Sequence, residues 1–292
     1  DYGAFLEGCG NSSARWIAPW CHHVGSGPKK TLQINDLGSF SKVNINSGIS
    51  AYLTVGSAAS FEVSIYENVA DGLQVQVSGD TLHISMKPHY CNHGASAKLQ
   101  TTMAPRGLRV NGGSPVSVDI LNGNLVVDGG SPVTVRHVAA SDFELSNNGG
   151  SPVTIHQVAC MRLKLGNNGG SPVTVHNVTC EELGVTNNGG SPVTVKHGSV
   201  RSCSVSNNGG SRVMLGSLTA TSGQISLHGG ASLQGMIAKD MDLHMSGGAH
   251  IDTTVSGRVS GSCNGGGFAT IRGGGSVSSL KTGGGCGKRA EL

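Results

Sequence analysis

Hydrophobic and polar residues recur in a fixed order along most of this chain, from residue 112 onward. Each repeat begins with a Gly-Gly pair, which an alternating stretch such as Val133-Thr134-Val135 follows. Successive pairs lie 17 residues apart once, then 20 residues apart five times, then 18 residues apart twice, beginning at Gly112, Gly129, Gly149, Gly169, Gly189, Gly209, Gly229, Gly247 and Gly265. A period near 20 with strand-like alternation is typical of a β-solenoid in which each repeat forms one coil.

Placing the repeats under one another predicts which side chains form the core. One column is valine in consecutive repeats and consists of Val133, Val153, Val173 and Val193. Threonine occupies the next column, and an aliphatic residue returns in the column after that. Because neighbouring residues of a strand point to opposite faces, we expect the valines to point inward and the threonines outward. A second strand, with Leu145 and Leu165 in one apolar column, completes each coil.

The Gly-Gly pairs are predicted to form turns between strands. Asparagine pairs precede several of them, and the second members of these pairs form a turn ladder of Asn148, Asn168, Asn188 and Asn208. Asn and Gly tolerate left-handed backbone conformations, and stacked Asn side chains can hydrogen-bond along a parallel, in-register array. With about 4.8 Å between coils, about nine coils would form a straight rod roughly 45 Å long.

Four segments are expected along the chain. They are an irregular N-terminal arm (1–30), a β head (31–104), the parallel β-solenoid (105–285) and a polar tail (286–292). The head lacks the Gly-Gly period but alternates strongly between apolar and polar residues, which predicts strands. The expected head strands cover residues 31–34, 41–45, 51–55, 62–66, 73–77 and 82–86.

The arm carries both tryptophans, Trp16 and Trp20, and we expect it to act in assembly. A solenoid must shield its terminal coils, because an open β edge and an exposed hydrophobic end recruit other chains. The C-terminal segment offers no amphipathic helix that could serve as a cap. Two possibilities follow: the arm caps its own rod, or the arm or the head docks on the open end of a neighbour and builds a filament.

A family resemblance rests on the head and the Gly-rich repeats together. The stretch QINDLGSFSKVNINSGISAYLTVGSAASFEVSIYENVADGLQVQVSGDTLHISMKP resembles the start of the putative auto-transporter adhesin family with a head GIN domain. The later repeats resemble the solenoid of that family, so the likeness covers roughly residues 31–282. The Gly-Ile-Asn of the family is Gly48-Ile49-Ser50 in this chain. The resemblance implies a surface-associated β-solenoid with no established enzymatic activity.

Composition narrows the function classes. Charged residues make up only 13% of the chain and aromatic residues only 4%, with 47 glycines, which disfavours an ordinary helical enzyme. The net charge of +3 is spread without a basic run, so nucleic acid is not an expected partner. No stretch approaches 18 consecutive apolar residues, so no membrane span is expected.

Several features favour secretion to the cell surface or the extracellular space. The chain begins at Asp1 instead of Met, which suggests that a leader was removed, and its eight cysteines suit an oxidising compartment. Candidate glycosylation sites lie at Asn11 and Asn177, each two residues before Ser or Thr.

The cysteines suggest disulfides at two places. Cys9 and Cys21 could form a bridge within the arm. Cys160 and Cys180 occupy one column in consecutive coils, where the spacing of about 4.8 Å suits a disulfide, although two buried thiols are an equal alternative. No partner can be assigned to the remaining cysteines from the sequence.

No catalytic residue, metal site or cofactor is predicted. His156 and His176 share an outward column with Arg136 and Lys196, and a solvated basic ladder is favoured over a metal site because no carboxylate or thiolate supports the pair. Carboxylates fall in different columns or on opposite faces, which disfavours acid–base catalysis.

The expected function is therefore structural. We predict a secreted, non-enzymatic rod that assembles with copies of itself into an extracellular filament or surface layer. The alternative is a monomeric adhesin or glycan-binding module that contacts surface glycans through its head or its outward strand face.

Overall fold

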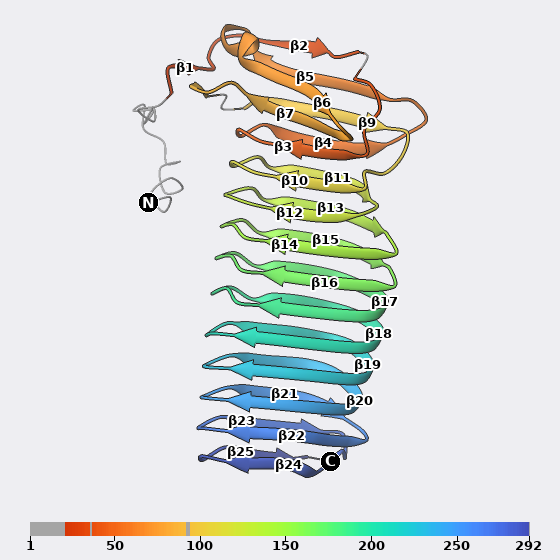
Figure 1. Ribbon diagram of the computed structural model, residues 1–292, viewed down its shortest axis with the longest axis vertical. Coiled ribbons are helices and arrows are strands. Elements are labelled where there is room, and N and C mark those ends of the chain that lie inside the picture. Colours follow the sequence, from red (N-terminus) through yellow and green to blue (C-terminus); the bar gives the residue numbers. More distant parts are fainter. Residues whose placement is uncertain (1–20, 36, 92–93, 292) are drawn as a thin grey trace.

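The chain forms a long β rod with a head at its N-terminal end (Figure 1). The computed structural model describes residues 21–35, 37–91 and 94–291. Strands make up 66% of the described residues, helix is almost absent among them, and the solenoid has about nine turns, so the predicted all-β parallel solenoid is confirmed. Within the described residues, one hydrogen-bonded sheet of 23 strands winds along the rod and continues into the head.

Each coil places two strands on opposite sides of a narrow core. The first side, which we call the β13 face, stacks in parallel β11 (Val116–Leu121), β13 (Val133–Ala139) and β15 (Val153–Ala159). The other side, the β14 face, stacks in parallel β10 (Gly107–Val110), β12 (Asn124–Val127), β14 (Asp142–Asn147) and β16 (Arg162–Asn167). Register is kept from coil to coil: Val133 pairs with Val153, and Val153 pairs with Val173.

Further along the rod, one continuous strand bends around the edge and supplies both faces. These long strands are β17 (Val173–Asn187), β18 (Val193–Asn208), β19 (Arg212–His228) and β20 (Ser232–Ser246). The last coils divide again into β21 (His250–Val255), β22 (Arg258–Asn264), β23 (Phe268–Arg272), β24 (Ser276–Gly283) and β25 (Gly287–Ala290). Residues 287–290, which lie within the predicted polar tail, thus pair with β23 as a parallel strand.

The core is an uninterrupted stack of aliphatic side chains. Val133, Val153, Val173 and Val193 are each at most 1% exposed. Opposite them lie the leucines of the β14 face, such as Leu145 and Leu165. Burying a column of this kind removes apolar surface from water in every coil, and the resulting stabilisation of about 25 cal/mol per Å² grows with rod length.

The Gly-Gly turns are tight because the coils approach closely there. A Cβ atom added at Gly149 would lie 2.0 Å from the carbonyl oxygen of Gly129 in the preceding coil. Only glycine can occupy such a position without moving the backbone, which explains why the first glycine of these pairs recurs with the coil period.

The head continues both faces of the rod. β3 (Lys42–Ile45) and β4 (Ser50–Val55) form its first coil, and β7 (Thr81–Met86) and β9 (Ser96–Thr101) stack on them in parallel. Beyond these the pairing becomes antiparallel, with β6 (Leu73–Ser78) on β7, β5 (Ser60–Tyr66) on β9 and β2 (Lys29–Gln33) on β5. A short 3-10 helix, η1 (Glu67–Gly72), joins β5 to β6. One hydrophobic cluster runs through head and solenoid.

A disulfide between Cys21 and Cys91 holds the start of the described chain against the head. It lies beside a small two-stranded sheet of β1 (His23–Val24) and β8 (Tyr90–Cys91). The prediction that Cys21 pairs with Cys9 is therefore wrong, because antiparallel folding of the head brings Cys91 to Cys21 from 70 residues away. Cys9, Asn11, Trp16 and Trp20 lie outside the described residues.

A disulfide and a lysine side chain hold the last described coil. Cys263, which is fully buried in β22, forms a disulfide with Cys286 at the start of the last strand. The Lys288 ammonium group donates to the carbonyl oxygens of Val277 and Leu280, at 3.0 and 2.7 Å. A charged side chain directed at a strand edge discourages another strand from pairing there.

Candidate functional site

The predicted asparagine ladder lies on the outside of the turn. The side-chain amide of each member donates to the carbonyl oxygen of the member one coil earlier, with distances of 3.2 Å for Asn168 to Asn148, 3.0 Å for Asn188 to Asn168 and 2.9 Å for Asn208 to Asn188. Asn148 continues the ladder to a carboxylate oxygen of Asp128. Each coil therefore satisfies the polar groups of the next, which marks this ladder as structural.

The first asparagine of each pair forms a second ladder that the sequence did not distinguish. Asn147, Asn167, Asn187 and Asn207 are completely buried among the aliphatic columns. Asn187 donates to the carbonyl oxygen of Ser191 at 3.1 Å and to the hydroxyl of Ser211 at 2.7 Å. These amides bind backbone groups of the turn that would otherwise be buried without partners. The strand period could have indicated the difference, because neighbouring residues face opposite sides.

The histidine column is an outward basic row. The rings of His156 and His176 lie 4.8 Å apart, centroid to centroid, on the β13 face. Partial desolvation, followed by the charges of Lys196 and His156, lowers the pKa of His176 below its ordinary value. In the part of the chain that the structure describes, no group of three or more His, Cys, Asp or Glu could hold a metal ion.

Cys160 and Cys180 are free thiols, so the proposed bridge between them is wrong and the alternative of two thiols holds. Equivalent residues of stacked parallel strands point the same way about 4.8 Å apart, whereas a disulfide draws its Cβ atoms to roughly 3.5–4.5 Å. A hydrogen bond from Cys180 lowers the pKa of Cys160, and the same contact, followed by burial, raises the pKa of Cys180. Burial raises the pKa of Cys203, which is also free, to about 12.

Asn177 lies on β17 between Gln157 and His197 of the adjacent coils. Its side chain is exposed, and so is that of Thr179, the hydroxyl residue of the acceptor pattern. A modifying enzyme could reach this position on the β13 face, and glycosylation there stays a prediction.

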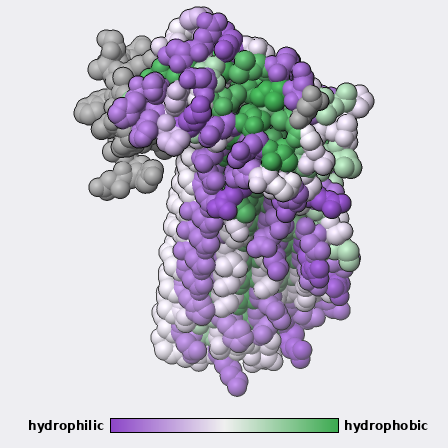
Figure 2. Space-filling model, turned by 45° about the horizontal axis from the view of Figure 1, so that its top comes forward, coloured by the Kyte–Doolittle hydropathy of each residue, from purple (hydrophilic) through white to green (hydrophobic). Residues whose placement is uncertain are grey.

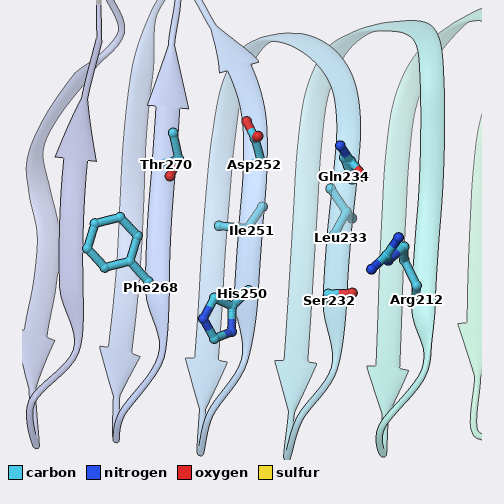
Figure 3. A pocket seen from close by; sticks show the side chains of 9 residues that line it. All are labelled: Arg212, Ser232, Leu233, Gln234, His250, Ile251, Asp252, Phe268 and Thr270. Carbon is cyan, nitrogen blue, oxygen red and sulfur yellow. The ribbon is translucent and has the colours of Figure 1, made fainter.

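A shallow notch of about 200 Å³ opens on the β13 face of the C-terminal coils (Figure 3). Its residues form two outward columns of consecutive strands. The first column contains Arg212, Ser232, His250 and Phe268, and the second contains Gln234, Asp252 and Thr270. The buried side chains of Leu233 and Ile251 lie beneath. The strand register thus fixes the points from which these side chains extend.

The notch arises where the repeat loses its proline. Pro132, Pro152, Pro172 and Pro192 occupy the place in earlier repeats that Arg212 takes next. Ser232 is small compared with its column neighbours Arg212 and His250, so it leaves space between them. The departure from an otherwise regular repeat at Arg212 is the signal in the sequence that marks this site.

The notch brings hydrogen-bonding, charged and aromatic side chains close together. The Nδ1 atom of His250 lies 2.7 Å from the carbonyl oxygen of Gly248, so Nδ1 carries the proton and Nε2 is an acceptor in the neutral ring. Asp252 forms an ion pair with Arg272, while the amide of Gln234 is exposed. Phe268 is 40% exposed.

The Phe268 ring lies over the next coil because its strand partner there is glycine. A Cβ atom at Gly287 would lie 2.5 Å from two carbons of the ring. The site therefore combines an accessible aromatic ring with hydrogen-bond donors and acceptors, an arrangement that suits a polar ligand with an apolar face.

The fold and its surface define a class: a two-faced parallel β-solenoid whose turns are stabilised by asparagine ladders and whose head continues the same sheet. The chain belongs to the family described as putative auto-transporter adhesin, head GIN domain, whose model matches residues 39–275. The predicted family resemblance is confirmed. The family is named for adhesion and not for an enzymatic activity, and its name indicates a surface or extracellular location.

Solved structures share the fold. One, from Parabacteroides distasonis and described as a putative lipid binding protein, has 16% identity and a TM-score of 0.52 over 91% of this chain and 98% of that one. Another from the same species, described as a putative adhesin, has 13% identity and a TM-score of 0.50 over 92% of this chain and 99% of that one. A search of curated proteins gives no match. In the described ranges, no helix has the length and hydropathy needed to cross a bilayer.

Proposed function

We propose that this protein is a surface adhesin whose rigid solenoid presents the notch on the β13 face to a saccharide. The family name supports the adhesin-like role. The saccharide as ligand class follows from the chemistry of the notch. An aromatic ring can pack against the apolar C–H face of a sugar ring, while the exposed side chains around it exchange hydrogen bonds with hydroxyl groups.

The observation that carries this proposal is the Phe268 ring beside exposed polar side chains on consecutive rigid strands. The strand backbone around the notch is ordered before a ligand binds, so association has to order only side chains, which lowers its entropic cost. Its small, open shape suits one or two sugar units at the end of a chain more than a ligand enclosed on all sides.

Binding to an immobilised panel of oligosaccharides tests the proposal. Phe268→Ala and Gln234→Ala should each weaken binding to any recognised sugar by about tenfold, because each removes a contact worth roughly 1.4 kcal/mol. Thr194→Ala is the matched control, since it truncates an outward residue of the same face away from the notch. Equal binding by all three variants, or no binding to the panel, would contradict the proposal.

Assembly into a filament is a second candidate. In the described part of the chain, β2 and β6 at one end and β24 and β25 at the other each pair on one side only, which leaves strand edges open for another copy. Lys288 and the Cys263–Cys286 disulfide oppose this assembly at the C-terminal end.

Electron microscopy together with light scattering separates the two candidates. Ordered fibres that form as concentration rises would support the filament, and Lys288→Met should then increase their number. Discrete particles at every concentration would contradict the filament and leave the single displayed rod.

A further inference from the structure

A line of basic side chains runs along the β13 face in the middle coils, and we call it the basic row. Its members lie two residues after the outward threonine of each strand and are Arg136, His156, His176 and Lys196. Strand register keeps them in line, because the buried residues just before them pair from coil to coil. Figure 2 shows that hydrophilic residues form rows along the solenoid. Arg136, His156 and Lys196 are exposed and His176 is half-exposed, so a partner in solution can reach the whole row.

Hydrogen-bonding side chains flank the basic row on both sides. On one side lies the outward threonine column, which consists of Thr134, Thr154, Thr174 and Thr194. On the other side lies a column of His137, Gln157, Asn177 and His197. Every member of the two columns is exposed or half-exposed. The surface therefore offers hydroxyl, amide and imidazole groups beside a line of cationic groups.

Carboxylates are scarce on this surface. The strands β13, β15 and β18 and residues 173–179 of β17 contain no Asp or Glu. The carboxylate that meets the basic row is Asp119 of β11, which lies 3.3 Å from the Arg136 guanidinium group. Acidic residues of the same coils form ion pairs beyond the β13 face, as Glu181 does with Arg201. Arg136, Lys196 and Asp119 together carry one net positive charge, and protonation of the four histidines of this surface adds four more.

The histidines make this charge depend on pH. Histidine ordinarily changes its charge between about pH 5 and 8. Desolvation, followed by the charges of Lys196, His156 and His197, lowers the pKa of His176. The next strand along the rod, β19, places the uncharged Gly216 and Ser217 beside the row, and Ser217 lies 2.6 Å from Nδ1 of His197. A bound anion stabilises the protonated rings, so by linkage its affinity should rise as the pH falls.

The geometry of the basic row favours one kind of anionic partner. Its members recur about every 4.8 Å, whereas the phosphates of a nucleic acid strand recur about every 3.4 Å. The strands that carry the row contain no Phe, Tyr or Trp on which a base could stack. None of the exposed large hydrophobic side chains in the described part of the chain lies in these columns, which disfavours a membrane surface.

A linear saccharide with a carboxylate on every sugar fits the surface better. Its charges are separated by one pyranose ring, a distance comparable with the spacing of the coils, and its hydroxyl groups can exchange hydrogen bonds with the threonine and amide columns. The rod is straight over these coils because every pair of strands keeps its register. Several consecutive sugars can therefore meet consecutive coils.

We infer that the basic row binds a linear acidic saccharide that lies along the rod on the β13 face, and that protonation of the histidines strengthens this contact. The inference is independent of the notch, because the row lies on β13, β15, β17 and β18 and shares no residue with the notch. Either site can be present without the other.

Titration calorimetry with oligogalacturonate tests the inference, and the methyl ester of the same oligosaccharide is the uncharged control. The carboxylates of the probe have a pKa near 4, so they stay ionised at both pH values of the experiment. Affinity should be several-fold higher near pH 5.5 than near pH 7.5, and the ester should not bind. No binding, equal affinity at the two pH values, or equal affinity for the ester would overturn the inference. The protein should come from a bacterial host, because a glycan at Asn177 would cover the row.

Charge-removing substitutions locate the contact. Arg136→Gln together with Lys196→Gln should weaken binding by about tenfold, which corresponds to roughly 1.4 kcal/mol. Lys164→Gln together with Lys281→Gln removes the same charge from exposed positions of the β14 face and should change affinity by less than about twofold. Circular dichroism checks that both double variants keep their strands. Equal losses in the two would show attraction by net charge alone and would overturn the inference.

Histidine substitutions test the pH dependence. His156→Gln together with His176→Gln should remove most of the difference in affinity between the two pH values. His244→Gln, on the β14 face, should preserve it, and so should Phe268→Ala, which alters only the notch. A pH dependence that survives the loss of both row histidines would overturn the role of their protonation.

Two other anions test the choice of partner. Vesicles that contain phosphatidylglycerol and a short DNA duplex are compared with oligogalacturonate at the same concentration of negative charge and the same ionic strength. Binding should be tightest to the saccharide. Equal or tighter binding to the vesicles or to the duplex would overturn the assignment of an acidic saccharide.

Discussion

The middle coils of the rod and its two ends are held by different interactions. In the middle, the buried and the exposed asparagine ladders pass hydrogen bonds from coil to coil, and the cysteines there, Cys160, Cys180 and Cys203, are free thiols. At the ends, disulfides join Cys21 to Cys91 and Cys263 to Cys286. A repeating ladder satisfies a group only when a neighbour lies beyond it, so a terminal coil needs a different kind of closure.

The largest loss of stability should come from a substitution in the core of the middle coils. Leu183→Ala removes a side chain that is 2% exposed and packs between Leu163 and Cys203 of the adjacent coils. We expect a loss of about 3–4 kcal/mol in the free energy of unfolding, measured by denaturant titration, because neighbouring coils cannot collapse into the cavity. Thr186→Ala, exposed on the same strand, should change stability by less than about 0.5 kcal/mol. Similar losses for the two would show that the core is not tightly packed.

Removal of the C-terminal disulfide should lower the local stability of the C-terminal coils and leave that of the middle coils unchanged. The double variant Cys263→Ala with Cys286→Ser removes a bridge that spans 23 residues, which corresponds to about 3 kcal/mol of chain entropy. Hydrogen exchange should accelerate in β24 and β25 but not in β15 or β17. Acceleration along the entire rod would mean that the ends and the middle unfold as one unit.

Loss of a side chain should reduce stability more in the buried asparagine ladder than in the exposed one. Asn187→Ala leaves buried backbone groups of the turn without their partner and should cost about 2 kcal/mol. Asn188→Ala removes the exposed hydrogen bonds to Asn168 and from Asn208, whose partners water can replace, and should cost about 0.5 kcal/mol. Thermal unfolding of both variants measures the difference, and a larger loss for Asn188→Ala would reverse the assignment of the inner and outer ladders.

The smallest expected effect is a difference in the reactivity of the free thiols, not in the stability of the fold. The hydrogen bond from Cys180 lowers the pKa of Cys160, so its thiolate fraction, which rises with pH, should reach half at a pH below that of an ordinary thiol. Alkylation by iodoacetamide near pH 8, followed by mass spectrometry, should modify Cys160 before Cys180 and Cys203, the other free thiols of the described residues. Cys203, whose pKa burial raises to about 12, should react only after unfolding. Equal rates at Cys160 and Cys203 would contradict this order.

Much of the fold was predictable because residues that recur with the coil period are the residues that stack on one another in successive coils. The valine column and the glycine turns follow from a period that each coil repeats. The head strands were also predicted closely, as shown by residues 73–77 and 82–86 against β6 and β7. Alternation of apolar and polar residues reflects which face of a strand meets the core, and this relation needs only local sequence.

The candidate site was harder to predict because it depends on departures from the repeat. Ser232 creates space only because Arg212 and His250 flank it on neighbouring strands. Gly287 accommodates the Phe268 ring only because these residues pair across coils. Each of these relations joins residues about one coil apart and is visible only once the register of the irregular last coils is known.

The sequence by itself determined that this chain is a parallel β-solenoid, because equivalent residues at a near-constant spacing can satisfy one another only when they lie in register. The tertiary structure decided which cysteines bond and how the rod ends. Cys21 meets Cys91 through the antiparallel strands of the head, and Cys286 reaches the core only through the final turn. Such contacts depend on the path of the chain in space, and a repeating pattern carries no information about the places where the repetition stops.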